Sequence, residues 1–325
     1  MPEDNSGIFI FTLDISSCFT YIYITNLIEG KTMTNSMNFL YENITNKILA
    51  LLEKGASPWK KNWSTKDFPM NLTTKIPYHG INVFMLLSSP YALTPFWLTW
   101  SQVMKLKGKV KEAEAKNYET VIFWKQLKFK NADDEEKSFP MVRYTRVYNL
   151  GQCELDAETL KKLVPETEAK EFNHIEACEN IVKGYKDCPD INHGGDRAYY
   201  SPLMDKIQMP LHESFSKEDN YYTTLFHEMG HSTGSEKRLK RFKANDTGMF
   251  GSETYSKEEL VAEMCASFLS AEAGIENNTI ENSAAYIKGW LKAIKNADRT
   301  FVVSAASKAN YAVNYILGRL QSKTN

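Results

Sequence analysis

The amino-acid sequence predicts an α+β fold divided into two domains. Three observations support this prediction: the chain length, the order of the hydrophobic patterns and an uneven distribution of charge. At 325 residues the chain exceeds the usual size of one domain, which is roughly 100 to 200 residues. Residues 33–150 carry 17 Lys and Arg against 10 Asp and Glu, whereas residues 151–325 carry 21 against 26. A basic half is therefore joined to an acidic half, and a basic half favours a polyanionic partner.

The composition is that of a globular protein. Hydrophobic residues make up 42% of the chain and charged residues 24%, which argues against wholesale disorder and against a membrane-embedded body. The five cysteines are few, odd in number and widely spaced, so they do not suggest a disulfide framework. We therefore expect a cytoplasmic protein without a membrane partner.

The first 32 residues differ from the rest. Residues 8–28 are apolar and aromatic, but Glu3 and Asp4 stand where a signal peptide needs positive charge, and Asp14 interrupts the apolar run. We expect residues 1–32 to be disordered or a misassigned N-terminal extension, with translation starting at Met33 or Met37.

The first domain is expected over residues 33–155. Apolar residues at helical spacing predict a helix over 38–54 that ends at Gly55, followed by a long loop over 56–76. A second helix is expected over 94–107, closed by Gly108. Residues 120–129 and 141–148 are rich in β-branched and aromatic residues and predict two strands, joined by an acidic turn over 133–136. This domain is therefore expected to be α+β.

A connection and a second domain are expected to follow. Residues 156–196 are polar and rich in Glu and Lys, which favours a linker with short helices. The second domain, over residues 197–325, opens with extended segments at 197–200 and 206–210. Helices are then expected over 219–233 and 256–273, with a C-terminal pair over 283–321 interrupted near Arg299. This domain is expected to be mostly helical with a small sheet.

The second domain contains the motif H-E-x-x-H, formed by residues 227–231. Residues four apart lie one turn apart on one face of a helix, so His227 and His231 can bind the same zinc ion. Glu228 projects about 100° away from His227, where it can act as the general base toward a metal-activated water. The motif predicts a zinc peptidase with one Zn²⁺ per chain, another divalent transition metal being the alternative.

Such a site needs a third protein ligand, and residues 256–263 supply three carboxylates. Ser256 and Glu259 stand in the spacing of a capping box, which gives Glu259 a structural role at a helix start. Glu263 has no such role and falls on a face of small residues that could approach the motif helix closely. We therefore expect Glu263 to be the third ligand, with Glu259 as the alternative ligand or as a carboxylate that orients a ligand histidine.

The basic half mixes aromatic and cationic residues, as single-stranded nucleic-acid sites do. Its candidate DNA-binding residues are Trp59, Lys60, Lys61, Trp63, Tyr78, His79, Arg143 and Arg146. The competing interpretation is that the tryptophans fill a small core and the lysines form a solvated face.

Taken in order, several short motifs resemble the ArdC antirestriction proteins. They are Pro58-Trp59-Lys60-Lys61-Asn62-Trp63, Tyr78-His79-Gly80-Ile81-Asn82, Tyr148-Asn149 with Gln152, Tyr200-Ser201-Pro202 with Asp205, Ile207 and Met209-Pro210, the H-E-x-x-H element, and residues 259–263. The resemblance covers about residues 37–320. It implies an N-terminal domain that binds single-stranded DNA, with Asn82 among the contacts. It also implies a C-terminal metallopeptidase domain of the zincin type, similar to the gluzincins, whose activity is either overt or latent. It also implies protection of incoming mobile-element DNA from restriction.

Two alternatives remain open at this point. The chain could be a DNA-protection protein whose peptidase site is vestigial, because the sequence identifies no protein or peptide substrate. It could also be a regulatory metalloprotease that cleaves a protein partner, with the basic domain recognising protein instead of DNA.

Overall fold

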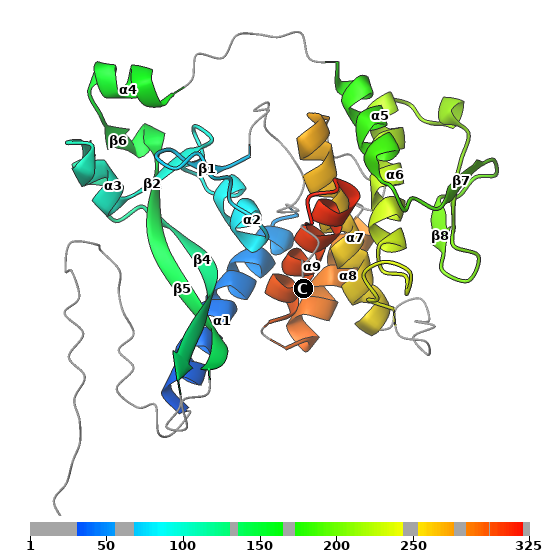
Figure 1. The fold of residues 1–325 in the computed structure, drawn as a ribbon, viewed down its shortest axis with the longest axis horizontal. Helices are drawn as coiled ribbons and strands as arrows, with labels where there is room; N and C mark the ends of the chain where they lie inside the picture. Colours follow the sequence, from blue (N-terminus) through cyan, green and yellow to red (C-terminus); the bar gives the residue numbers. More distant parts are fainter. Residues whose placement is uncertain are drawn as a thin grey trace, which may run out of the picture.

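A computed structural model describes residues 31–55, 68–130, 136–164, 173–242, 253–275, 284–298 and 300–320. Within these ranges the chain is mixed α and β and falls into two halves that lie side by side (Figure 1). The α+β class and the two-domain organisation expected from the sequence are thereby confirmed. The expectation for residues 1–32 concerns a segment almost wholly outside the described ranges.

The first half is built on a four-stranded sheet in the order β1-β2-β5-β4. The long antiparallel pair β4 and β5 continues the sheet as a ribbon beside α1 (Figure 1). The elements are α1 (Lys31–Glu53), β1 (Met70–Asn71), α2 (Ile81–Leu87), β2 (Phe96–Thr99), α3 (Trp100–Lys105), β3 (Lys109–Val110), β4 (Glu119–Lys130), β5 (Glu136–Asn149), β6 (Cys153–Glu154) and α4 (Ala157–Leu163). The expected first helix and both long strands are therefore present.

The helix expected over residues 94–107 is wrong in its first part. Phe96–Thr99 form strand β2, which pairs with β1 on one side and β5 on the other. Bulky aromatic residues there are buried between strands, and this tertiary setting overrides the helical spacing. The helix begins only after Thr99, whose side chain accepts a hydrogen bond from the backbone of Gln102 in a capping box.

The second half combines five helices with a three-stranded sheet, counted over the described residues. The sheet has the order β7-β9-β8, with β7 and β9 parallel and β8 and β9 antiparallel. The elements are α5 (His174–Gly184), β7 (Asp190–His193), β8 (Tyr199–Ser201), β9 (Lys206–Met209), α6 (Glu218–Ser232), α7 (Glu253–Ala273), α8 (Ala284–Asn296) and α9 (Phe301–Ile316). Each helix expected after residue 219 is present, including the interruption near residue 299.

The boundary between the halves lies earlier than the expected linker over residues 156–196 suggests. Within that range, α5 packs against α6 and α7, and β7 pairs with β9. Both elements therefore belong to the second half. The polar composition misled the sequence interpretation because α5 buries only a narrow stripe, with Cys178 and Ile181 as its buried residues.

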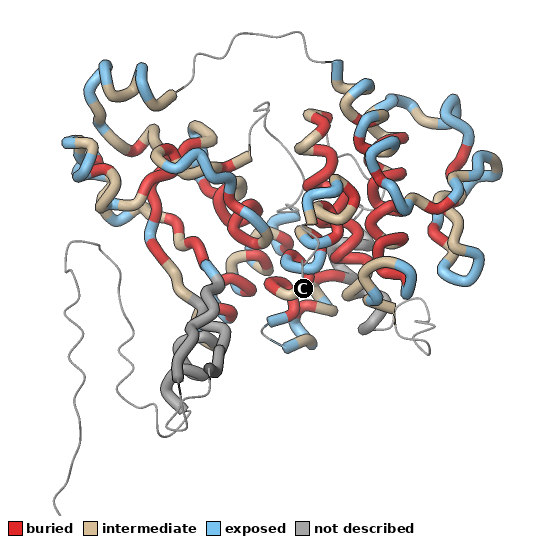
Figure 2. Tube along the Cα trace, in the orientation of Figure 1, coloured by how far each residue is buried: buried red, intermediate tan, exposed pale blue. Residues whose placement is uncertain are grey.

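The two halves share one hydrophobic core. Phe84 of α2 stacks on Phe268 of α7, with ring centroids 4.7 Å apart, and α1 packs against α8 and α9. The buried residues of α2, α7 and α9 lie in the interior where the halves meet (Figure 2). The position of the first half relative to α7 is therefore set by apolar packing.

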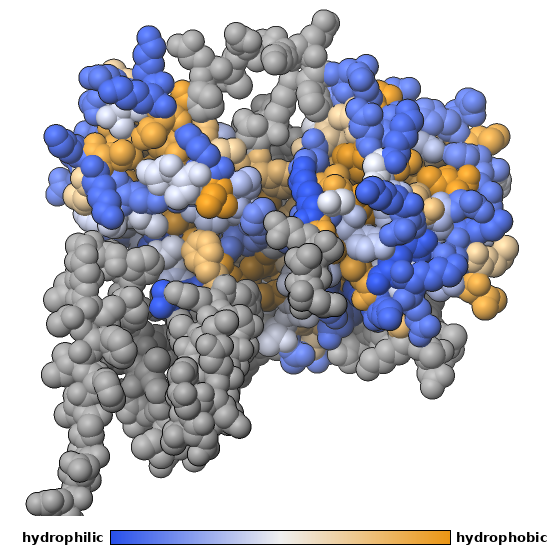
Figure 3. All heavy atoms as spheres, viewed as in Figure 1, coloured by the Kyte–Doolittle hydropathy of each residue, from blue (hydrophilic) through white to orange (hydrophobic). Residues whose placement is uncertain are grey.

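The surface of the second half is polar where it is visible. Hydrophilic residues cover most of that face, and hydrophobic residues gather in smaller groups (Figure 3). No helix in the described ranges is long and apolar enough to cross a membrane. Cys153, Cys178, Cys188 and Cys265 are free thiols.

Candidate metal centre

The H-E-x-x-H motif lies in the last two turns of α6, a helix whose sequence is too apolar for a solvated surface. Tyr222, Leu225, Phe226 and Met229 are buried, and they fix the helix against α7 and the small sheet. His227 and Glu228 are buried as well, at 3% and 5% exposure, although both are polar. Buried polar groups need partners, and for His227 they are Glu259 and Glu263 of α7.

Three side chains converge between α6 and α7. The Nε2 atoms of His227 and His231 lie 3.0 Å apart. The carboxylate of Glu259 faces both of them, with Oε2 at 3.5 Å from Nε2 of His227 and Oε1 at 3.3 Å from Nε2 of His231. Two imidazoles and one carboxylate therefore form a triangle of donor atoms, and these three residues form a group that could hold a metal ion.

The size of this triangle fits a divalent transition metal. With metal–ligand bonds of about 2.0–2.1 Å and tetrahedral angles, two ligand atoms on one zinc ion lie about 3.3 Å apart. The three distances of 3.0, 3.5 and 3.3 Å, of which the last two end on different oxygens of Glu259, bracket that value. Two histidines and one carboxylate also leave a fourth position open, as in catalytic zinc sites.

Glu263 lies on the other side of His227. Its Oε2 atom is 3.4 Å from Nδ1 of His227, the ring nitrogen that faces away from the donor triangle. The structure thus places Glu259 beside the Nε2 atoms of both histidines and Glu263 beside Nδ1 of His227, where it can orient the ring. This geometry favours the alternative, Glu259, over Glu263 as third ligand, and the choice between them stays a prediction.

The reason for this difference lies at the start of α7. The sequence interpretation placed Glu259 in a capping box with Ser256, but the helix already includes Glu253. Glu259 is therefore in the helix interior, one turn before Glu263 on the same face. A carboxylate in that position has no backbone amide to cap, and it is available to the two histidines.

His231 also has a carboxylate behind it. Oε1 of Glu258 lies 3.9 Å from Nδ1 of His231, and Arg241 donates to both oxygens of Glu258, at 2.5 and 3.1 Å. Arg241 further donates to the carbonyl oxygen of Gly230 at 2.9 Å and to Oγ1 of Thr233 at 2.7 Å. Arg241 thus joins Glu258 to the end of α6. The contact between Arg241 and Glu258 could not be predicted from the sequence, because Arg241 lies outside both helices and its spacing from Glu258 matches no local motif.

Electrostatic coupling in the site is strong. Burial alone would lower the pKa of His231, but the carboxylates of Glu259 and Glu258 outweigh it and raise the pKa to about 10. Burial would raise the pKa of Glu259, yet the imidazoles of His231 and His227 hold it well below its usual range. The two partners therefore stabilise each other's charge when no metal is present. Because ligand histidines must be neutral, metal binding would release a proton.

Close approach of the two helices depends on Gly230. A Cβ atom at this position would lie 3.2 Å from Cα of Ala262 and 3.2 Å from Cβ of Cys265. The small-residue face that the sequence predicted on α7 is therefore in contact with the motif helix. Glycine at 230 lets α7 come near enough for Glu259 to reach both histidines.

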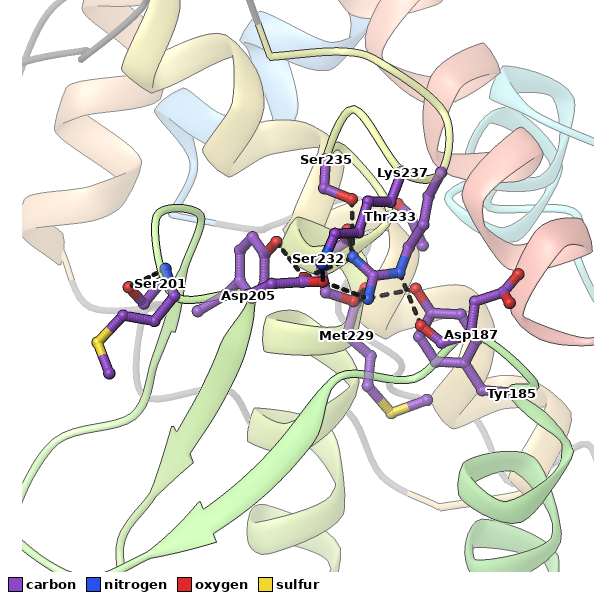
Figure 4. A network of polar contacts seen from close by, with 12 residues as sticks. Tyr185, Asp187, Ser201, Asp205, Met229, Ser232, Thr233, Ser235 and Lys237 are labelled. Atoms are coloured by element: carbon purple, nitrogen blue, oxygen red, sulfur yellow. Dashed lines mark hydrogen bonds and ion pairs between the residues drawn. The ribbon is translucent and has the colours of Figure 1, made fainter. Parts of the chain in front are cut away.

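The C-terminal end of α6 is held by a second polar network (Figure 4). Arg238 donates to Oδ1 of Asp205 at 2.7 Å, to the carbonyl oxygen of Ser232 at 3.1 Å and to that of Asp187 at 2.7 Å. Lys237 and Tyr200 also donate to Asp205, at 2.9 and 2.8 Å. Asp205 precedes β9, so this network ties the small sheet to the helix end that carries His231.

The candidate DNA-binding residues are only partly described. Trp59, Lys60, Lys61 and Trp63 lie outside the described residues, so their role stays a prediction. Tyr78 is buried and His79 exposed on the loop before α2. Arg146 is exposed and lies over the ring of Tyr118, 4.3 Å from its centroid, and Arg143 is partly exposed on the same strand.

Asn82 has a structural role. Its side-chain amide donates to the carbonyl oxygen of Ile122 at 2.7 Å and accepts from the backbone N–H of Ile122 at 2.8 Å. This pair of hydrogen bonds attaches α2 to β4 and engages both ends of the amide. This arrangement gives Asn82 a structural role, and a DNA contact by Asn82 stays an untested prediction.

Comparison with known proteins gives the family. A model of zincin-like metallopeptidases matches residues 176–308, and a model of the N-terminal domain of anti-restriction factor ArdC matches residues 38–148. Protein y4eC of Sinorhizobium fredii (strain NBRC 101917 / NGR234) is 32% identical over 291 residues, which cover 85% of this chain and 91% of that protein. The chain belongs to the ArdC family.

Solved structures and a longer relative agree with this membership. The crystal structure of metal-free antirestriction ArdC protein from R388 plasmid aligns with a TM-score of 0.68 at 29% identity, covering 87% of this ArdC-family chain and 99% of the other. The Mn(II)-bound structure of that protein gives the same TM-score at 28% identity, covering 86% and 97%. DNA primase TraC of Escherichia coli is 31% identical over 294 residues, 85% of this chain, which spans only 27% of TraC's length.

Proposed function

We propose that this ArdC-family protein binds single-stranded DNA through its first half and hydrolyses peptide bonds at a metal centre in its second half. The observation that carries the proposal is the donor triangle of His227, His231 and Glu259, whose edges match one tetrahedral metal ion. A buried Glu228 directly follows the first ligand in the chain.

The metal expected in this centre is Zn²⁺. Two imidazoles and one carboxylate suit zinc, while Mn²⁺ is the alternative that the Mn(II)-bound ArdC structure suggests for this donor set. When bound, the ion would supply a Lewis acid that polarises the scissile carbonyl and activates water.

The chain's own residues would have separate roles in the site. Glu228 is proposed as the general base, which takes a proton from the attacking water on its carboxylate and passes it to the leaving amine. Glu263 and Glu258 would hold the rings of His227 and His231 through their Nδ1 atoms. Arg241 would keep Glu258 in place.

The DNA-binding part of the proposal rests on the basic charge of residues 33–150 and on family membership. In this account the protein protects incoming mobile-element DNA from restriction in the cytoplasm. Titrations of a labelled single-stranded oligonucleotide at several salt concentrations test the binding. If the protein contacts phosphates, the logarithm of its binding constant should fall linearly with the logarithm of the salt concentration. Affinity that does not change with salt would contradict binding through phosphates.

Replacing Glu228 by Gln tests the peptidase part. The variant should keep the metal and the fold, while cleavage of unfolded casein, measured with and without single-stranded DNA, should fall by about 10²–10⁴-fold. Glu236→Gln, a change after the end of α6, is the control and should cleave like the parent. The same variants can be compared in a plasmid-transfer assay against a restricting host, which separates the two functions. Full protection by Glu228→Gln would show that antirestriction does not need proteolysis. A parent protein that never cleaves would indicate a vestigial peptidase site.

A further inference from the structure

A cavity of about 510 Å³ lies between the two halves, and none of its lining residues belongs to the candidate metal centre. We call it the interdomain pocket. The first half contributes the loop that leads into α2 and part of β4, and the second half contributes one face of α9. The lining residues are Asn71, Thr74, Ile76, Pro77, Tyr78, His79, Gly80, Ile81, Asn82, Ile122, Phe123, Val303, Ser307 and Asn310. This volume is within the range of small-ligand sites, which is roughly 300–1,000 Å³.

The pocket walls are aromatic and apolar. The rings of Tyr78 and Phe123 lie 6.4 Å apart at a tilt of 39°, and 44% of Phe123 is exposed although it is a large hydrophobic residue. Ile76, also in the lining, is 60% exposed. Exposed aromatic and aliphatic surface inside a concavity favours a flat, apolar ligand.

The polar groups of the pocket divide into two sets. The amides of Asn71 and Asn82 are engaged by neighbouring protein groups, Asn71 with Thr73, Thr74 and Gln102 and Asn82 with Ile122. They shape the wall and are not available to a ligand.

Ser307 and Asn310, by contrast, stand on α9 four and seven residues after Val303, which places all three on one helical face. Among the described residues no hydrogen bond to the hydroxyl of Ser307 or to the side-chain amide of Asn310 is found. These two groups, together with the imidazole of His79, can therefore form hydrogen bonds with the polar edge of a ligand.

The surroundings of the pocket favour a ligand that carries negative charge outside its flat part. None of the described lining residues is acidic. Arg143 of β5 stands directly opposite Phe123 in the β4–β5 register, so both side chains project from the same face of the sheet. A cation beside an aromatic wall is the combination that holds a base together with its phosphate.

We propose that the interdomain pocket takes one unpaired nucleobase of a bound DNA single strand, stacked against Phe123 and Tyr78 and read by Ser307 and Asn310. The inference rests on the proposed DNA-binding function and adds a site to it. Because α9 supplies part of the pocket, a bound strand would contact both halves of the protein at once.

The test compares two ligands on the full chain: labelled oligothymidylate and an abasic oligomer of the same length, measured by fluorescence anisotropy at one fixed salt concentration. Both carry the same phosphates, and only the first carries bases. The parent should bind the oligothymidylate at least about tenfold more tightly, since stacking of bases on aromatic side chains strengthens binding by about this factor per base. Ser307→Trp, which fills the pocket, should remove most of that difference and leave affinity for the abasic oligomer unchanged.

Phe123→Ala is a second variant, which removes an aromatic wall of the pocket without filling it. It should lower the ratio of the affinity for oligothymidylate to the affinity for the abasic oligomer about fivefold or more. Tyr199→Ala is its matched control, because Tyr199 is a similarly exposed aromatic residue on β8 outside the pocket. Equal losses on both oligomers, or an unchanged ratio in both variants, would overturn the pocket while leaving DNA binding intact. A parent that binds neither oligomer would overturn the DNA-binding function and the pocket together.

Discussion

Oε2 of Glu263 lies 3.4 Å from Nδ1 of His227, on the side of the imidazole opposite the nitrogen that faces Glu259. His227 thus lies between two carboxylates that stand one turn apart on α7. In metal sites a carboxylate beside Nδ1 orients the ring and selects the tautomer, so that Nε2 faces the metal. Glu259 and Glu263 therefore face different nitrogens of His227, which their spacing alone does not show.

Glu263→Gln should weaken metal binding without abolishing it. The amide keeps the shape of the side chain but removes the carboxylate beside Nδ1 of His227, and changes of this kind typically lower metal affinity by about 10–100-fold. Competition with a chromophoric chelator measures the affinity. Glu272→Gln is the control on the same helix, since Glu272 pairs with Arg319 and stands well outside the donor triangle. Equal affinity for Glu263→Gln and the parent would mean that this carboxylate does not support the histidine.

Gly230→Val should destabilise the fold. The added side chain would meet Ala262 and Cys265 at the contact of α6 with α7, and overpacking of this kind costs about 1–3 kcal/mol. Urea denaturation of the metal-free protein measures the free energy of unfolding. Gly184→Val is the matched control, because a Cβ atom at Gly184 meets nothing within 4 Å. A similar loss in both variants would show that close packing at residue 230 is not the cause.

Asp205→Asn should change how stability depends on pH. Burial would raise the pKa of Asp205, but hydrogen bonds from Arg238, Lys237 and Tyr200 hold it far below its ordinary value near 4. A group with a lowered folded-state pKa stabilises the protein above its unfolded-state pKa, and this stability is lost as the pH falls. The variant should therefore be about 1–3 kcal/mol less stable at pH 7, and the difference should shrink below about pH 4.

Denaturation of both proteins at several pH values measures this difference. Asp190→Asn is the control, because its ion pair with Lys206 is solvent-exposed and 3.7 Å long, and such pairs contribute little. A difference between Asp205→Asn and the parent that stays constant down to pH 3 would contradict the role of the Arg238 network.

Most of the helices could be predicted from the sequence, because their apolar spacing and their stops are local signals. Gly55 ends α1 in the left-handed conformation with a φ of 74°, and the interruption between α8 and α9 falls where the pattern breaks. The juxtaposition of His227 and His231 was likewise predicted from spacing alone, since four residues make about one turn of any helix.

Other features depend on contacts between distant segments, which a local pattern does not contain. Phe96–Thr99 became a strand because β1 and β5 flank it, and Glu259 became the carboxylate nearest the histidines because α7 includes residues before Ser256. Arg241 reaches Glu258 only through the turn that follows α6. The role of Asn82 depends on β4, forty residues later in the chain.

The position of a bound metal ion tests the account most directly. Crystals of the full chain soaked in Zn²⁺ or Mn²⁺ would show the ion by anomalous scattering. We expect one peak within about 2.0–2.2 Å of Nε2 of His227, Nε2 of His231 and a carboxylate oxygen of Glu259. A peak bound by Glu263 in place of Glu259, or no peak at the two histidines, would contradict it.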